Sequence, residues 1–132
     1  MIVLSEDSPR LADSPSSRSV RAGTEAARIV GCRIHYIPQE EEGYTASEAL
    51  SYLPAQDEIT PGIWLAYIPS AEWYTAMYKA ALEKRIHLLN TPEEHLNAQE
   101  FDRTYPRLGE LTPASVIVTL PMLIGAFRER HA

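Results

Sequence analysis

Four polar residues stand just after the predicted strands of this sequence, where an open α/β sheet binds its ligands. Ser5 and Asp7 follow the apolar run that begins the chain, and Asn90 and Thr91 follow a second apolar run that begins at Ile86. Because the carboxyl ends of parallel strands line the ligand crevice of such sheets, we expect these four side chains to face a substrate. The same reasoning places five further residues at strand ends: Glu6, Pro38, Gln39, Pro69 and Ser70.

The segment after Ile86 is also explained by helix capping without any ligand. Thr91 is a suitable N-cap, Pro92 fits the first helical position, and Glu94 falls where its carboxylate reaches back to the Thr91 amide. A free helix N-terminus there would favour an anion, whereas a capped one only joins strand to helix. Asn90 and Thr91 are therefore either a ligand site or a structural joint, and the joint is the simpler explanation.

Motifs for other chemistries are missing from the sequence. It has no Gly-x-Gly-x-x-Gly or Walker-type phosphate loop, no His-Glu-x-x-His or Cys/His spacing typical of zinc, and no Gly-x-Ser-x-Gly nucleophile elbow. Cys32 has no activating partner nearby in sequence, and the three consecutive glutamates that begin at Glu40 are typical of a solvated loop. We therefore predict no catalytic residue, no metal site and no cofactor in this chain.

Composition narrows the class of protein further. The 132 residues carry a formal net charge of −6, and the lysines among them are Lys79 and Lys84. This charge argues against a surface for nucleic acid or anionic membranes, which needs clustered basic residues. No apolar run approaches the roughly 20 residues of a membrane span, and the first residues lack the pattern of a signal peptide. We expect a cytoplasmic protein that binds neither nucleic acid nor membrane.

Apolar periodicity and turn residues predict strands that alternate with helices. The expected strands are 1–4, 32–37, 63–68, 86–89 and 115–120, and the expected helices are 20–30, a short one after Thr45, 70–85, one that begins at Pro92, and 121–130. This alternation predicts an α/β, Rossmann-like three-layer domain with a mainly parallel sheet covered by helices. We assign residues 1–118 to this domain, with a flexible loop at 8–19, and residues 119–132 to the truncated start of a following domain or a C-terminal helix.

Several short motifs, in the order in which they occur, resemble one known family. The segment IPSAEWYTAMYKAALEKRIHLLNTPEEHLNAQEFDRTYPRLGELTPASVIV contains Asn-Thr-Pro-Glu leading into a helix, then Tyr-Pro-x-Leu and Leu-Thr-Pro-x-Ser-Val. Together with MIVLSEDSPR and AARIVGCRIHYIP, it resembles the N-terminal pre-ATP-grasp region of bacterial ATP-grasp domain proteins, which are ligase-like and of the carboxylate-amine type. The resemblance covers most of the chain.

The resemblance implies a substrate or assembly domain that packs against a following ATP-grasp domain. ATP and Mg²⁺ would bind to that second domain, whose lysines and acidic metal ligands have no counterparts in residues 1–132. We therefore expect a truncated or split ligase-like protein that is inactive alone, with the missing or separate ATP-grasp domain as its partner.

Two other functions remain open on sequence alone. A stand-alone interaction module would self-associate through an exposed sheet edge or through the region of Trp73 and Tyr74. A small independent enzyme would rest only on the loop residues near Ser5 and Asn90, because no catalytic constellation accompanies them. The module is the stronger of these two alternatives.

Overall fold

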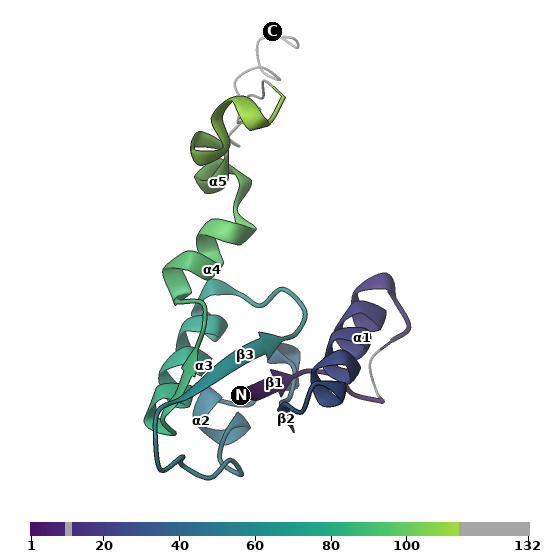
Figure 1. The fold of residues 1–132 in the computed structure, drawn as a ribbon, viewed down its shortest axis with the longest axis vertical. Coiled ribbons are helices and arrows are strands. Elements are labelled where there is room, and N and C mark those ends of the chain that lie inside the picture. The colour runs from purple at the N-terminus through teal and green to yellow at the C-terminus, as the bar shows by residue number, and fades with distance from the viewer. Residues whose placement is uncertain (10–11, 114–132) are drawn as a thin grey trace, which may run out of the picture. The chain divides into compact units, whose positions relative to one another are not determined.

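Four short strands form one parallel sheet in the order β2-β1-β3-β4 (Figure 1). The strands are β1 (Ile2–Ser5), β2 (Arg33–Tyr36), β3 (Thr60–Leu65) and β4 (Ile86–Leu88). The computed structural model describes residues 1–9 and 12–113. The chain divides into two compact units, Met1–Leu96 and Asn97–Ala132, and the whole sheet belongs to the first.

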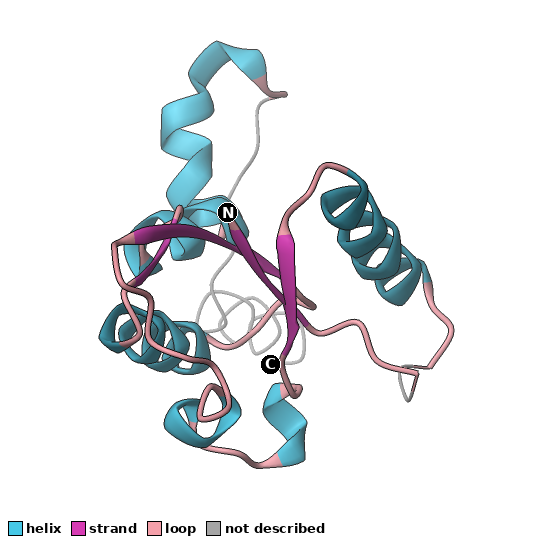
Figure 2. Cartoon of the chain, turned by 60° about the horizontal axis from the view of Figure 1, so that its bottom comes forward, coloured by secondary structure: helices cyan, strands magenta, loops and turns pink. Residues whose placement is uncertain are grey.

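Helices cover both faces of the sheet, which confirms the α/β three-layer fold predicted from the sequence (Figure 2). α1 (Pro15–Ile29) lies on one face, and α2 (Ala46–Ala49) and α3 (Ala71–Glu83) lie on the other. Alternation of side chains along β1 produces this arrangement. Ile2 and Leu4 join the core shared with α2 and α3, whereas the Ser5 hydroxyl contacts Thr24 of α1.

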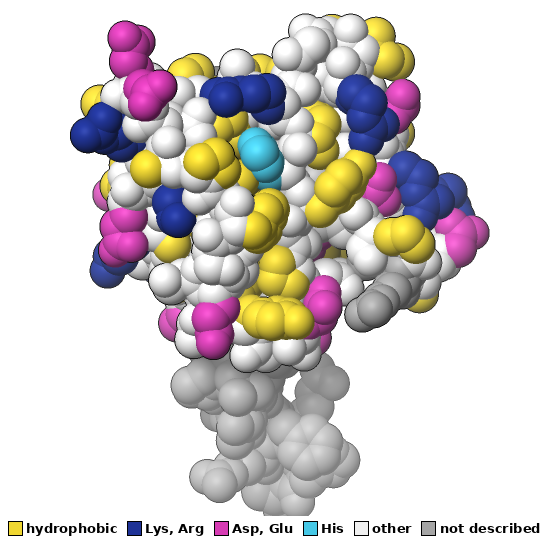
Figure 3. All heavy atoms as spheres, turned by 90° about the horizontal axis from the view of Figure 1, so that it is seen from below, with side chains coloured by type: hydrophobic (Ala, Val, Ile, Leu, Met, Phe, Trp, Pro, Cys, Tyr) yellow, Lys and Arg dark blue, Asp and Glu magenta, His cyan; other side chains and the backbone are white. Residues whose placement is uncertain are grey.

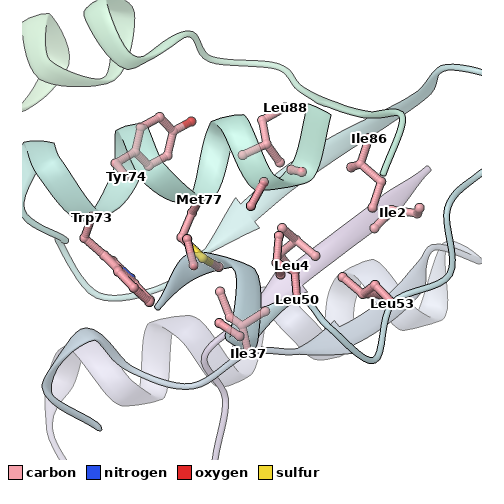
Figure 4. Packing of buried hydrophobic residues seen from close by; sticks show 14 residues of the cluster. Ile2, Leu4, Ile37, Leu50, Leu53, Trp73, Tyr74, Met77, Ile86 and Leu88 are labelled. Carbon is pink, nitrogen blue, oxygen red and sulfur yellow. The ribbon is translucent and has the colours of Figure 1, made fainter. Parts of the chain in front are cut away.

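The main hydrophobic core lies between the sheet and the layer of α2 and α3 (Figure 4). Tyr74 and Met77, three residues apart on α3, are 2% and 0% exposed, as the amphipathic pattern of this helix predicted. Trp73 is buried as well. The Trp73 and Tyr74 region is therefore part of the core, and the prediction that it forms a surface for self-association is wrong.

Gly62 of β3 lies where the sheet is packed most tightly. It pairs with Ile2 of β1 on one side and with Leu88 of β4 on the other. A Cβ at this position would lie 2.7 Å from Ile86 Cγ2 and 3.0 Å from Leu88 Cδ2. Because both neighbours are buried core side chains, only glycine fits here without rearrangement.

β3 is a central strand, as predicted, but its boundaries differ from the expected 63–68. The observed strand, Thr60–Leu65, begins three residues earlier and includes Pro61 and Gly62, which the sequence suggested as turn residues. Both pair with β4. The predicted end of the strand is also wrong, because Tyr67 and Ile68 leave the sheet and are 56% and 70% exposed.

α1 begins at Pro15, inside the segment 8–19 that the sequence predicted as a flexible loop. Ser14 is the N-cap: its hydroxyl accepts the Ser17 N–H at 3.1 Å, and the Ser17 hydroxyl accepts the Ser14 N–H at 2.9 Å. Pro15 occupies the first helical position. Composition misled the prediction, because serine and proline are typical both of loops and of helix starts. Gly31, with φ 85°, follows the helix end as predicted.

The remaining described elements are short. They are the 3-10 helices η1 (Glu40–Glu42) and η2 (Gly109–Leu111) and the helices α4 (Pro92–Gln99) and α5 (Phe101–Leu108). α4 begins at Pro92, as predicted. The predicted strand at 115–120, the helix at 121–130 and the domain boundary at 118–119 lie outside the described residues.

Candidate functional site

The carboxyl end of β1 brings three consecutive polar residues to the edge of the sheet. The first of them, Ser5, is fully buried. Its hydroxyl lies 2.6 Å from Thr24 Oγ1 and accepts the Asp7 N–H at 3.0 Å. Ser5 therefore connects β1 to α1, and its hydroxyl, which the sequence predicted to face a substrate, is paired inside the fold.

Asp7 borders a crevice of about 800 Å³ at the ends of β1 and β2. Arg21 of α1 lies beside it and donates from Nε to Asp7 Oδ1 at 3.4 Å, a long contact for an ion pair. Tyr36 and Pro38 contribute apolar surface to the same crevice, and Glu42 adds a second carboxylate. The crevice thus offers charges of both signs beside apolar surface, which suits a small polar ligand.

Glu6, between these two residues, is a buried carboxyl group. It is 4% exposed, and its Oε2 accepts the backbone N–H of Tyr67, in the loop after β3, at 3.0 Å. Burial raises the pKa of Glu6 to about 7; the Tyr67 N–H opposes this shift, and the carboxylates of η1 add to it. Glu6 therefore changes its charge close to neutral pH.

A second crevice, of about 340 Å³, opens beside Glu6. It is lined by Val20 of α1 and the N-cap residue Ser14, and also by Glu41 and Tyr67. Glu6 also marks the point where the strand order changes direction, since the chain runs from β1 out to β2 and then back to β3 on the other side. Open α/β sheets bind ligands outside the strand ends at such a switch point.

The carboxyl end of β4 has the capping geometry that the sequence predicted. The Thr91 N–H donates to Glu94 Oε2 at 2.8 Å, and the Glu94 N–H donates to Thr91 Oγ1 at 3.2 Å. The backbone N–H and the hydroxyl of Thr91 lower the pKa of Glu94 below its usual value. Thr91 therefore serves as a helix cap, and its polar groups are already used.

Asn90 lies next to a small crevice of about 170 Å³ with aromatic and aliphatic walls. Its backbone carbonyl accepts the Tyr74 hydroxyl at 2.8 Å, and the Tyr74 ring stacks on His95 with centroids 3.8 Å apart and planes 5° apart. Burial lowers the pKa of His95, because desolvation disfavours the charged imidazolium. Trp64 completes the aromatic wall. The crevice has no charged group to orient a ligand among its described lining residues.

Strand register keeps the two predicted pairs of site residues apart. Gly62 pairs with both Ile2 and Leu88, so β4 ends level with the first residue of β1. The end of β1 lies three residues further along the sheet, at Ser5, or roughly 10 Å at the rise of a parallel strand. Asp7 and Asn90 accordingly border different crevices.

The sequence did not identify three residues at the carboxyl end of β1 as site residues. Glu6 stood at a predicted strand end but was not selected as facing a substrate, and Arg21 and Tyr67 were not identified. The available signal was a carboxylate directly after a buried strand. The burial of the Glu6 carboxylate depends on the loop after β3, and the position of Arg21 depends on the start of α1 at Pro15. Neither could be derived from local sequence.

Other kinds of site are not found in the described part of the chain. Within residues 1–9 and 12–113, no group of three or more His, Cys, Asp or Glu side chains could hold a metal ion. None of the described helices combines the length and apolar character of a membrane span. No protein-family model, curated protein or solved structure matches the sequence. The fold and its crevices define the class: an α/β protein with a polar edge at the carboxyl end of β1.

Proposed function

We propose that this chain is the N-terminal substrate-binding or assembly domain of an ATP-grasp ligase-like protein of the carboxylate-amine type, inactive alone. The observation that carries the proposal is the crevice at the carboxyl end of β1, where Asp7 and Arg21 present opposite charges beside the Tyr36 ring. The parallel α/β fold and the motif resemblance support the same role. Asp7 is the predicted site residue that this crevice retains.

In this proposal, ATP and Mg²⁺ bind to a separate ATP-grasp domain. The described lining of the two crevices at the β1 end includes Arg21 but no lysine, and it includes the carboxylates of Glu6, Asp7, Glu41 and Glu42. A triphosphate would be repelled by so many carboxylates without a metal or a phosphate-binding loop to compensate. This edge therefore suits a substrate better than a nucleotide.

Thermal unfolding of the full chain, with and without Mg-ATP, tests whether this chain lacks a nucleotide site. We expect neither ATP hydrolysis nor a shift in Tm, and a clear upward shift would contradict the absence of a nucleotide site. The DNA that follows codon 132 gives a second test. A reading frame for a Lys- and Glu-bearing ATP-grasp domain would support the proposal, and a long non-coding stretch would favour the stand-alone interaction module.

A stand-alone interaction module is the second candidate, and one observation favours it. Beside β4, an edge strand of the described sheet, Ile59 and Leu82 are 77% and 44% exposed and border a crevice of about 380 Å³ with Arg85 and His87. The face seen in Figure 3 likewise mixes hydrophobic side chains with basic and acidic ones. Light scattering after size exclusion tests this candidate: a stable dimer supports the module, and a monomer at high concentration contradicts self-association.

A further inference from the structure

Glu6 has a carboxylate oxygen that the described part of the protein does not use. Oε2 accepts the Tyr67 N–H at 3.0 Å, and no hydrogen bond to Oε1 is present among the described residues. The side chain is 4% exposed, so bulk water solvates it poorly, and it borders the 340 Å³ crevice. A carboxylate oxygen that has no protein donor among the described residues, on a side chain that borders a crevice, can accept a hydrogen bond from a ligand.

Several of the other polar groups around this crevice are already paired. The Ser14 and Ser17 hydroxyls bond to each other's backbone N–H groups at the start of α1. Glu40 and Glu42 are also engaged: Glu40 Oε2 accepts the Ser70 N–H at 2.9 Å, and Glu42 Oε1 accepts the Gln39 N–H at 3.0 Å. Glu41, between them, is exposed, lines the crevice and makes no such bond within the described residues.

Among the described lining residues, the charge of the crevice is negative and comes from two carboxyl groups. The buried Glu6 and the exposed Glu41 both line it, and none of the described lining residues is basic. Val20 and the Tyr67 ring supply apolar surface. An anion would meet like charges here, and a hard metal ion would find too few converging oxygens in the described residues.

We propose that the crevice between Glu6, Glu41 and Tyr67 binds a small organic cation, an ammonium or guanidinium group carried on an apolar body. The cationic head donates to the unused oxygen of Glu6, with Glu41 nearby as a second negative charge. The apolar body lies against Val20 and Tyr67. Such charge-assisted hydrogen bonds in a site of low solvent access are among the stronger polar contacts that a protein makes.

Ionisation of Glu6 supports this assignment and adds a readout. Its pKa of about 7 means that a bound cation must shift the carboxyl group towards its charged form. The charged groups that face Glu6 are the carboxylates of Glu40, Glu41 and Glu42, while α1 and the loop after β3 contribute only uncharged lining residues. Affinity for the cation should therefore rise as the pH increases through 7.

This inference goes beyond the ligase-like role and does not depend on it. The thermal shift with Mg-ATP can contradict that role while a cation still binds beside Glu6. Conversely, an absent cation site would leave the crevice at Asp7 and the ATP-grasp proposal untouched. The two claims therefore fail in different experiments.

The test is a titration of the full chain with n-butylammonium at about pH 8, where Glu6 is ionised, followed by NMR. The size-matched probes n-butanol and butyrate are titrated alongside. We expect n-butylammonium to bind and the other two to bind at least about tenfold more weakly, the effect of one charge-assisted hydrogen bond. Equal binding of butyrate, or no binding of n-butylammonium and n-butylguanidinium at tens of millimolar, would overturn the proposal.

Three variants locate the site. Glu6→Gln keeps the size of the side chain and an acceptor for the Tyr67 N–H, and should weaken cation binding about tenfold or more. Glu41→Gln changes an exposed residue, so the fold should be kept, and it should weaken binding to a smaller extent. Glu83→Gln removes one charge at the exposed end of α3 and should leave affinity unchanged. Full affinity in both Glu6→Gln and Glu41→Gln would overturn the assignment.

Discussion

The carboxyl ends of β1 and β4 both lead towards a helix N-terminus, but they differ in how completely their polar groups are paired. After β4, Thr91 and Glu94 bond to each other at 2.8 and 3.2 Å. After β1, Glu6 uses one of its two oxygens within the described part of the chain, and Asp7 reaches Arg21 only at 3.4 Å. A polar residue at a strand end thus indicates a ligand site best when the neighbouring chain does not satisfy its hydrogen bonds.

The largest expected effect concerns the β1 end and the pH dependence of stability. The folded-state pKa of Glu6, about 7, lies above the ordinary glutamate value of 4.5. Between these values the folded chain binds more protons than the unfolded chain, so the free energy of unfolding falls as pH rises through this window, by on the order of 3 kcal/mol in total. Urea unfolding at several pH values measures it.

Glu6→Gln is the variant that isolates this effect. Between pH 4.5 and about 7, the free energy of unfolding of this variant should fall much less than that of the wild type. At higher pH the variant should therefore be more stable than the wild type. Glu83→Gln is the charge-matched control and should keep the wild-type profile. A Glu6→Gln profile that declines as steeply as the wild type would show that Glu6 is not the buried titrating group.

Gly62→Ala tests the close packing between β3 and β4. The added Cβ would lie 2.7 Å from Ile86 Cγ2, so overpacking should lower the free energy of unfolding by about 1–3 kcal/mol. Gly23→Ala is the matched control, because its Cβ would lie 3.6 Å from Leu65 Cδ1 and α1 should gain about 0.5–1 kcal/mol from the loss of a helical glycine. Equal denaturation midpoints for the two variants would contradict the packing described for β4.

Thr91→Ala tests whether the β4 end is a structural joint. Loss of the N-cap should lower stability by about 0.5–2 kcal/mol, as measured by chemical denaturation and by hydrogen exchange in α4. Thr91→Ser keeps the hydroxyl and should recover most of the loss. Affinity for n-butylammonium should not change, and a variant that kept its stability but lost a ligand would contradict the joint.

Arg21→Gln has the smallest expected effect. The Arg21 side chain is 53% exposed and its contact with Asp7 is long, so removal should change the free energy of unfolding by less than about 1 kcal/mol. Arg18→Gln breaks the more exposed pair with Asp13 and is the control. A loss well above 1 kcal/mol would mean that Arg21 is a structural residue and not a group available to a ligand.

Local signals in the sequence were sufficient for most of the fold. The α/β class, the caps at Thr45, Ser70 and Thr91 and the glycine after α1 follow from spacing and residue type, and the structure contains them. The start of α1 and the limits of β3 were wrong. In both places proline, glycine or serine satisfies the rules for a turn and for a regular element equally well, and only tertiary packing decides between them.

The candidate site was less predictable than the fold, because it depends on contacts between segments far apart in sequence. Sequence position alone could not show that the Ser5 hydroxyl is hydrogen-bonded to Thr24. Nor could it show that Glu6 accepts a hydrogen bond from Tyr67, 61 residues further along the chain. The strand register could not be predicted from the sequence either. It places the end of β4 level with Ile2 and so separates Asn90 from Asp7.

The most direct test of the contrast between the two strand ends is a map of amide chemical shifts in the full chain during titration with n-butylammonium. We predict that the amides of Glu6 and Tyr67 shift progressively, because the ligand changes the charge of the carboxyl group that accepts the Tyr67 N–H. The amides of Thr91 and Glu94 should stay unchanged. Shifts confined to Asn90, Thr91 and Glu94, with Tyr67 unaffected, would contradict the account and return the ligand site to the end of β4.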